Sequence, residues 1–385
     1  MNKSFKFRLY PNTEQRESLA KMFGCCRFIY NRMLSDKKTH YESTGKMLKT
    51  TPAQYKNIYP WLKEADSLSL CNEQLHLEAA YKNFFREKSV GFPKFKSKHR
   101  GHNSYTTNLV NGNILLADDF IKLPKLNKVK IKQHRPIPDN YRLKSATVKL
   151  MPSGKYYASI LYEYETNISP VEIVNVVGLD FSMPELYVDS DGKNPSYPKP
   201  YRTEQSKLVK AQRKLSKRKR GGSNYRKQKC KVARLHEHIS NQRSDFLHKQ
   251  SRRITNAYDA VCVEDLNMKG MSQALNFGKS VSDNGWGMFT RMLEYKLIER
   301  GKCFVKIDKW FPSSKTCSAC GLVKDELPLA ERVFRCGCGF VLDRDINAAI
   351  NIRNEGIRII NRGTHGDSSV NFPPLGGTTQ EAPVS

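Results

Sequence analysis

The chain has 385 residues, 38% of them hydrophobic, which is enough for two or three domains with ordinary cores. Its 66 Lys and Arg outnumber 37 Asp and Glu, and the net charge of +29 indicates a polyanionic partner, usually nucleic acid. No apolar run is long enough to cross a membrane, and no secretory leader or amphipathic or lipidated anchor accompanies the charge, so we expect no membrane partner.

The amino-terminal hundred residues combine one strand with helices. Residues 2–10 alternate apolar and polar side chains as a strand does, and a Pro-Asn pair ends the pattern. Thr13 is then suited to cap a helix whose apolar residues follow at helical spacing. A second helical pattern covers 67–86, so we expect a helical insertion at 13–103.

A basic stretch rich in helix breakers, 90–104, separates these helices from a set of strands. Its candidates for contacts with phosphate are Lys94, Lys96 and Lys98. A solvated linker is the plain alternative. From 105 to 164 short alternating segments with turn residues between them predict strands. We expect residues 1–12 and 104–168 to form one small β-barrel-like module in which the first strand pairs with the others.

A different unit begins near residue 171. We interpret Val174–Val177 as part of a central strand that is buried on both faces, and 186–188 as the next strand of a hairpin. Asp180 lies near the end of the first of these strands. Burying a carboxylate there is costly unless a cation pairs with it, so a metal-binding role is favoured over a chance surface position.

Residues 206–253 are the most basic part of the chain, with 17 Lys and Arg against 2 acidic residues. Helical periodicity continues on both sides of Gly221-Gly222, which predicts a helical hairpin with one apolar face and one charged face. The candidate nucleic-acid contacts are Lys217, Arg218, Lys219, Arg220, Arg226 and Lys227. A solvated charged helix is the alternative, but charge of one sign repels itself unless a polyanion is bound.

Three more elements lead toward the carboxyl terminus. An apolar strand within 257–271 ends in acids, the first of which is Glu264, and an amphipathic helix at 286–301 and a strand at 303–311 follow. The tail 363–385 lacks Lys and Arg and is rich in Gly, Pro, Ser and Thr, which predicts disorder.

Four cysteines are spaced as two pairs that can fold together. They are Cys317, Cys320, Cys336 and Cys338. A closed set of four thiolates suits Zn²⁺ and leaves no position for water, so the predicted zinc is structural. Burial of these cysteines as small apolar residues is the alternative. The remaining six cysteines are scattered and are expected to be core or inert surface thiols.

Two aspartates follow the cysteines and precede an Ala-rich helix. Asp345 stands about where the helix N-cap is expected, so a capping role alone is one interpretation. A chemical role is the other. Together with Asp180 and Glu264 it would supply the oxygen ligands of a two-Mg²⁺ phosphodiesterase, in which two hard cations hold the attacking water and the leaving oxygen. The spacing makes an RNase H-like αβ fold reasonable but does not establish that the three acids converge.

The ordered set of motifs from about residue 7 to residue 362 resembles TnpB, the OrfB protein of bacterial insertion sequences. The matching segments are FRLYPNTEQRESLAKMFGCCRFIYNRML, GFPKFKSK, VGLDFSMPELYVDSDGK, LSKRKRGG…LHEHISNQRSDFLHK, VCVEDLNMKGM, SSKTCSACG and CGFVLDRDINAAINI. The resemblance implies an RNA-guided DNA endonuclease related to compact type V CRISPR effectors. It would act at a short flanking motif with an element-encoded guide RNA on double-stranded DNA.

The resemblance also implies roles for individual residues. A RuvC-like nuclease domain would span 169–309 and 341–362, with a zinc-binding module for target nucleic acid at 310–340. The Asp-Glu-Asp triad with magnesium corresponds to Asp180, Glu264 and Asp345, and Asp343 would be a neighbour only. The family more often has C-x-x-C where this chain has Cys336-Gly337-Cys338, so zinc would be held in a tighter turn.

Alternatives remain beside this hypothesis. A relative without cleavage would be an RNA-guided DNA-binding regulator, and a guide from a CRISPR array would make the chain a compact effector. A transposase proper ranks lowest because no Tyr or Ser recombinase motif stands out. We expect a cytoplasmic, nucleoid-associated bacterial protein, with one chain for each RNA favoured and the oligomeric state open.

Overall fold

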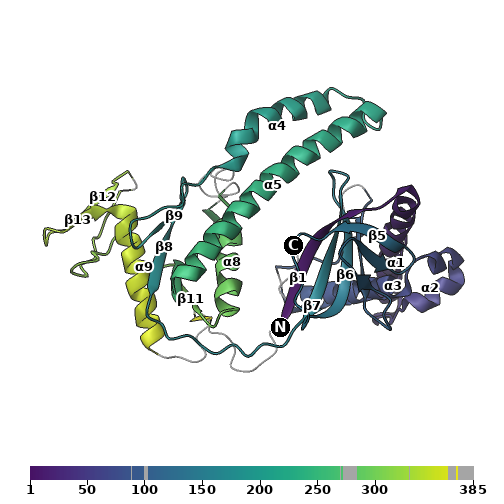
Figure 1. Cartoon of the computed structure of the whole chain (residues 1–385), viewed down its shortest axis with the longest axis horizontal. Helices are drawn as coiled ribbons and strands as arrows, with labels where there is room; N and C mark the ends of the chain where they lie inside the picture. Colours follow the sequence, from purple (N-terminus) through teal and green to yellow (C-terminus); the bar gives the residue numbers. More distant parts are fainter. Residues whose placement is uncertain are drawn as a thin grey trace. The chain divides into compact units, whose positions relative to one another are not determined.

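The computed structural model describes residues 1–87, 89–98, 103–268, 270–271, 284–328, 330–362 and 370–371. These residues divide into two compact units, the first ending at Thr166 and the second beginning at Asn167 (Figure 1). Each unit is described by itself. No described helix has the length and apolar character needed to span a membrane.

A seven-stranded antiparallel sheet forms the frame of the first unit. Its strand order is β2-β6-β7-β1-β5-β4-β3. The strands are β1 (Asn2–Tyr10), β2 (Asn103–Asn108), β3 (Leu115–Leu116), β4 (Phe120–Leu123), β5 (Asn127–Lys132), β6 (Arg142–Leu150) and β7 (Tyr156–Glu163). β1 pairs with both β5 and β7, so the expected pairing of the first strand with the later ones is confirmed. Its alternation buries Phe5, Phe7 and Leu9 on the inner face.

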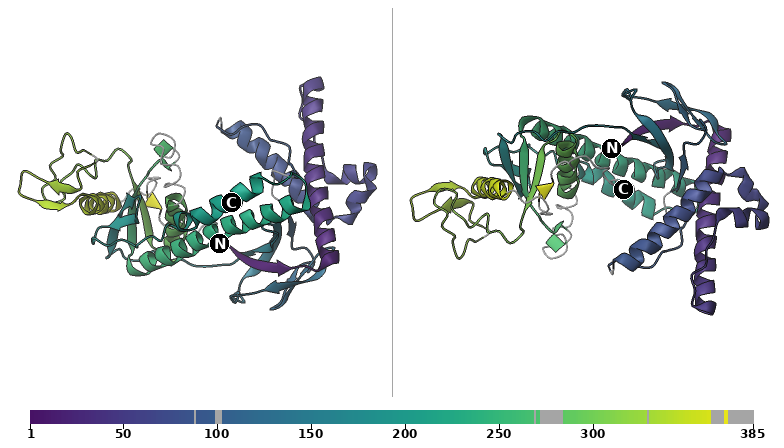
Figure 2. Two further views of the ribbon diagram at one scale, coloured as in Figure 1. Left: turned by 90° about the horizontal axis from the view of Figure 1, so that it is seen from above. Right: turned by 90° about the horizontal axis from the view of Figure 1, so that it is seen from below.

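Helices lie against that inner face (Figures 1 and 2). They are α1 (Thr13–Thr44), α2 (Pro52–Ile58), the short 3-10 helix η1 (Pro60–Glu64) and α3 (Ser67–Arg86). The cap of α1 differs from our prediction. Asn12, not Thr13, is the N-cap, because its side chain accepts a hydrogen bond from the Gln15 N–H at 2.8 Å while the Gln15 side chain accepts one from the Asn12 N–H. Gly45, in the left-handed region at φ 66°, ends the helix.

The second unit contains a five-stranded sheet in the order β14-β11-β10-β8-β9. The strands are β8 (Val176–Ser182), β9 (Leu186–Asp189), β10 (Ala260–Glu264), β11 (Cys303–Ile307) and β14 (Val370–Asn371). β8, β10 and β11 run parallel, and β9 and β14 are antiparallel to their neighbours. Our prediction that β8 includes Val174 was wrong, because the strand begins two positions later and Val174 is 70% exposed.

Helices cover both faces of this sheet (Figures 1 and 2). α5 (Ser223–Ala257) and α8 (Trp286–Ile298) pack over Leu179, Val263 and Phe304 on one face. α9 (Arg344–Asn361) packs over Cys262 and Val305 on the other. Because side chains alternate along a strand, each core strand contributes to both layers. α8 ends at Ile298, earlier than predicted.

The basic segment forms the predicted hairpin of helices, α4 (Pro200–Ser216) and α5. Leu208, Val232 and Ile239 are buried between them, and the Gln228 side chain donates a hydrogen bond to the Ala211 carbonyl at 2.9 Å. A small two-stranded sheet, β12 (Val333–Arg335) with β13 (Val341–Asp343), directly precedes α9. Of the tail 363–385, only Val370–Asn371 lies within the described residues, as β14.

Candidate functional site

The register of two parallel strands places the first two predicted acids side by side. β10 pairs with β8 so that Val263 is opposite Leu179. Asp180 and Glu264 are the next residues of the two strands, and neighbouring positions in parallel strands point to the same face. The two carboxylates therefore lie next to each other near the carboxyl ends of adjacent strands.

Two glycines show which face this is. A Cβ on Gly178, two residues before Asp180, would clash with the α9 backbone at Ala349. A Cβ on Gly356 of α9 would likewise clash with Cys262, two residues before Glu264. Gly178 and Cys262 thus face α9 at very close range, and the alternation of the strands turns both carboxylates toward the same helix.

The third acid comes from the first turn of that helix. Asp345 precedes Ala349 by four residues, so both lie on the side of α9 that faces the sheet. The interpretation of Asp345 as the N-cap was wrong. Asp343 is the cap, since its carboxylate accepts hydrogen bonds from the Asp345 N–H at 2.9 Å and the Ile346 N–H at 3.1 Å. Capping therefore does not occupy the Asp345 carboxylate.

The electrostatics of Asp180 involve both of the other acids. Burial raises the pKa of Asp180 well above its usual range, and the Glu264 and Asp345 carboxylates raise it further. Burial also raises the pKa of Glu264. The pKa of Asp345 is raised by burial and by Asp343, against the opposing charge of Arg332, whose guanidinium is 3.9 Å away and largely exposed. Mutually repelling carboxylates in a partly buried place fit hard divalent cations.

The oxygen atoms of the three carboxylates are farther apart than ligand atoms gathered around one ion. Within the described residues, only the four cysteines bring three or more ligand atoms within 4.8 Å of one another. Two ions about 3.5–4 Å apart can share more widely spaced acids. The three acids are thus more widely spaced than the ligands of the cysteine cluster.

A serine and two asparagines hold the segment beside Glu264. The Ser313 hydroxyl donates a short hydrogen bond to the Glu264 carboxylate. From α9, the Asn351 side chain donates to the carbonyls of Ser313 at 2.8 Å and Thr316 at 2.6 Å. Asn347 donates to Thr316 and accepts from the Ser318 N–H. Sequence reasoning did not identify Ser313, and the only available signal was its place in the SSKTC motif.

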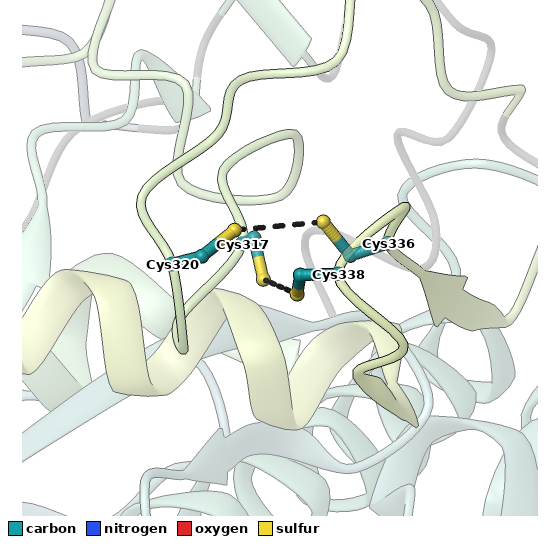
Figure 3. Close-up of side chains that lie close together, drawn as sticks. All are labelled: Cys317, Cys320, Cys336 and Cys338. Carbon is teal, nitrogen blue, oxygen red and sulfur yellow. Dashed lines mark hydrogen bonds between the residues drawn. The ribbon is translucent and has the colours of Figure 1, made fainter.

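The four predicted zinc ligands come together as expected (Figure 3). The Sγ atoms of Cys317 and Cys338 are 3.9 Å apart, and those of Cys320 and Cys336 are 3.6 Å apart. Tetrahedral Zn²⁺ with bonds of about 2.3 Å places its sulfur ligands about 3.8 Å apart. The cluster thus fits zinc, including the tight Cys-Gly-Cys pair.

Two backbone turns present these thiols. In one, the Gly321 N–H donates to the Cys317 carbonyl at 2.9 Å, and in the other the Gly339 N–H donates to the Cys336 carbonyl at 3.0 Å. Although desolvation opposes the effect, the backbone N–H groups of Cys320 and Ala319 help lower the pKa of Cys317 to about 7. A thiolate is therefore accessible near neutral pH, as metal binding requires.

The predicted basic contacts divide into two kinds. The four residues 217–220, between α4 and α5, are all exposed, and so are Arg226, Lys227, Lys94 and Lys98. Lys96 differs, because its ammonium pairs with the Glu73 carboxylate, which is 3% exposed, and lies 4.3 Å from the centroid of the Tyr30 ring. These surroundings favour a structural role for Lys96, and its contact with phosphate stays a prediction.

A basic face on the first unit's sheet was missed. The register sets Arg8 beside both Lys132 and Tyr157, on the face opposite the helices. The alternation of 4–10 and 128–132 carried the signal, since every second residue there is polar or basic while the others are buried. The residues of this face are Lys6, Arg8, Tyr10, Lys130, Lys132, Lys149 and Tyr157.

Three family models match the chain. Residues 159–275 match one described as "Probable transposase" of the OrfB_IS605 type, and 286–352 match "Cas12f1-like, TNB domain". Residues 1–46 match one described as "Helix-turn-helix domain". In this structure those residues form β1 and the single long helix α1, with the first residues of the following loop.

Curated relatives are similar along nearly the whole chain. A Streptomyces pristinaespiralis protein named "Putative RNA-guided DNA endonuclease" is 34% identical over 93% of this chain and 90% of its own length. The Escherichia coli protein "Putative RNA-guided DNA endonuclease InsQ" is 30% identical over 93% of both chains. A solved structure titled as a Cas12f1-sgRNA-target DNA complex has a similar fold, with a TM-score of 0.57, 12% identity and coverage of 92% of this chain and 99% of that chain.

Proposed function

This chain belongs to the TnpB (insertion-sequence OrfB) family, and from that premise we propose that it is an RNA-guided DNA endonuclease. It hydrolyses phosphodiesters of a DNA target that is complementary to a bound guide RNA and lies next to a short flanking motif. The observation that carries this proposal is the convergence of Asp180, Glu264 and Asp345 on one face of the second unit's sheet.

In the proposed RNase H-like (RuvC) centre, the protein's own task is to hold three carboxylates in fixed positions. Two of them stand on buried parallel strands, and the third stands on a helix that touches those strands at Gly178. Ser313 orients Glu264 through its hydroxyl. Bound Mg²⁺ would supply activation of water and neutralisation of the developing negative charge.

The other parts have supporting roles in this proposal. The four cysteines hold a structural Zn²⁺ in a module that contacts target nucleic acid. Guide RNA and DNA backbone meet the basic hairpin loop 217–220 and the basic face of the first unit's sheet, where exposed Lys and Arg can pair with phosphates. A cytoplasmic, nucleoid-associated location is part of the same proposal.

The decisive experiment compares cleavage and binding in one preparation. The protein is purified with its co-purifying RNA, the RNA is sequenced, and plasmids that carry the matching target are incubated with the complex and Mg²⁺. We expect linear or nicked plasmid with the unaltered chain. With Asp180→Ala we expect RNA and DNA binding to persist while cleavage disappears.

A matched control distinguishes the specific loss of the Asp180 carboxylate from the loss of any negative charge. Glu172, an exposed acid just before β8, is replaced by Ala, and cleavage should not change. Full cleavage by Asp180→Ala would refute the site. Target binding without cleavage by the unaltered chain would instead establish an RNA-guided DNA-binding regulator.

A further inference from the structure

Trp310 exposes its indole ring in an unusual way. Its relative exposure is 81%, compared with 42% for Trp61 and 2% for Trp286, the other two tryptophans of the chain. A large aromatic ring that remains in water gains nothing from burial on folding, and such rings are enriched where a partner is bound. The position therefore points to a ligand with a flat, apolar face.

A hydrogen-bonded turn carries this ring. The Asp308 carboxylate accepts a hydrogen bond from the Trp310 N–H at 2.6 Å, and the Asp308 carbonyl accepts one from the Phe311 N–H at 3.1 Å. Phe311 packs against the core cluster on the α9 face of the sheet. One aromatic residue thus anchors the turn while its neighbour is held out in solvent.

The turn is close to the carboxylate site at both of its ends. Ile307, the last residue of β11, pairs with Glu264, and the Ser313 hydroxyl donates to the Glu264 carboxylate. Trp310 is three residues from each of these two positions. Since an extended residue spans at most about 3.6 Å, its Cα lies within roughly 11 Å of both. The turn that carries this ring is therefore near the carboxylate site.

A cation accompanies the ring. The Lys309 ammonium lies 5.1 Å from the centroid of the Trp310 ring, and the lysine is exposed. An aromatic face next to a positive charge matches a nucleotide, whose base stacks on the ring while its phosphate pairs with the ammonium. Only an unpaired base offers its face in this way, so a single strand is favoured over a duplex.

We propose that Trp310 and Lys309 form a stacking site for one base of the single-stranded DNA that enters the carboxylate centre, next to the phosphodiester that is cut. The inference rests on the proposed nuclease function and adds a positioning site to it. Trp310 fixes the register of the strand, and Lys309 pairs with the adjacent phosphate.

Fluorescence tests the stacking without any cleavage. In a Trp61→Phe background the only exposed tryptophan is Trp310, because Trp286 is buried. The complex of protein and co-purified RNA, with Ca²⁺ in place of Mg²⁺, is titrated with a short thymidine oligonucleotide. We expect strong quenching that is absent when Trp310→Phe is added. The assignment would be overturned if the DNA oligonucleotide caused no quenching, or if an RNA oligonucleotide caused quenching and DNA did not.

Cleavage kinetics provide the second test. For a single-stranded DNA substrate with Mg²⁺, Trp310→Ala should raise KM by roughly 5- to 150-fold, the range for loss of one stacked base. Its kcat at saturation should change much less, Trp310→Phe should restore most of the loss, and Lys309→Ala should raise KM by a smaller factor. A KM within twofold of the unaltered chain would refute the site, provided that thermal unfolding is unchanged.

The two tests also separate this inference from the nuclease proposal. If the unaltered complex cuts no DNA but its Trp310 fluorescence is quenched by DNA, the nuclease proposal fails and the stacking site stands. If the complex cuts DNA, but DNA does not quench the Trp310 fluorescence and Trp310→Ala leaves KM unchanged, only the stacking site fails.

Discussion

The cysteine cluster and the three carboxylates are both candidate metal sites, but they are built in different ways. Each pair of cysteines comes from one short turn, and sulfur–sulfur distances of 3.6 and 3.9 Å already suit a metal. The carboxylates come from two core strands and a helix, and the pKa of Asp180 is raised by burial and by repulsion from the other two. The cysteine site thus depends on local turns, whereas the acidic site depends on the register of the whole sheet.

The largest expected effect is a difference in cleavage rate between substitutions of two aspartates at the start of α9. Asp345→Asn removes a charge from the acidic site, and we expect plasmid cleavage to slow by at least about 10³-fold. Asp343→Asn keeps an oxygen that can cap the helix, so cleavage should remain within about threefold. Single-turnover plasmid assays measure both. Equal losses in the two variants would mean that the cap, not Asp345, matters.

The cysteine site should respond to loss of one ligand without failure of the sheet. We expect Cys338→Ser to lower the zinc content from about one per chain and to increase hydrogen exchange in 312–343, because three thiolates hold zinc weakly. β8 and β10 should stay protected. Metal analysis with hydrogen-exchange mass spectrometry measures this. Cys71→Ser, at an exposed cysteine of the first unit, is the control and should retain its zinc.

Two glycines test how tightly each site is packed. Gly178→Ala pushes a methyl group into the α9 backbone, so we expect a loss of about 1–3 kcal/mol in the free energy of unfolding and reduced cleavage. Gly337→Ala, between two cysteines, has open space around the new Cβ and should change stability by less than about 0.5 kcal/mol. Denaturant unfolding of both variants measures the contrast. Comparable losses would contradict it.

The smallest effect concerns the residue that connects the two sites. Ser313→Ala removes one hydrogen bond to Glu264, and a loss of about 1 kcal/mol corresponds to a decrease of about fivefold in the cleavage rate. Zinc content should not change. Ser314→Ala is the matched control and should cleave normally. A loss of zinc in Ser313→Ala would show that this serine supports the cysteine turn instead.

Sequence patterns located the elements well where periodicity is strong. The bounds of α3 are those of the predicted pattern 67–86, and the strand at 2–10 and the helical hairpin were also found. The four zinc ligands were predictable because their spacing is itself the signal. The three acids were first singled out by their places at strand ends and at a helix start, and the motif resemblance then assigned them to one triad.

The features that sequence patterns did not predict depend on contacts between residues that are far apart in the chain. Asp343 and Asp345 are equally plausible caps by position, and only the helix geometry distinguishes them. Lys94 and Lys96 lie in the same basic stretch and cannot be told apart by sequence pattern. Only Lys96 pairs with Glu73, which is 23 positions earlier in the chain. The closeness of Asp180 to Glu264 follows from a strand register that no local pattern encodes.

The ends of the first unit adjoin each other. The amino-terminal ammonium of Met1 donates to the Tyr164 carbonyl at 2.6 Å, and the Tyr164 N–H donates to the Met1 carbonyl at 2.8 Å. The polypeptide therefore enters and leaves this unit at one spot, just before the boundary at Thr166. A short connector can therefore join the two ends of this unit, which makes the chain suited to circular permutation there.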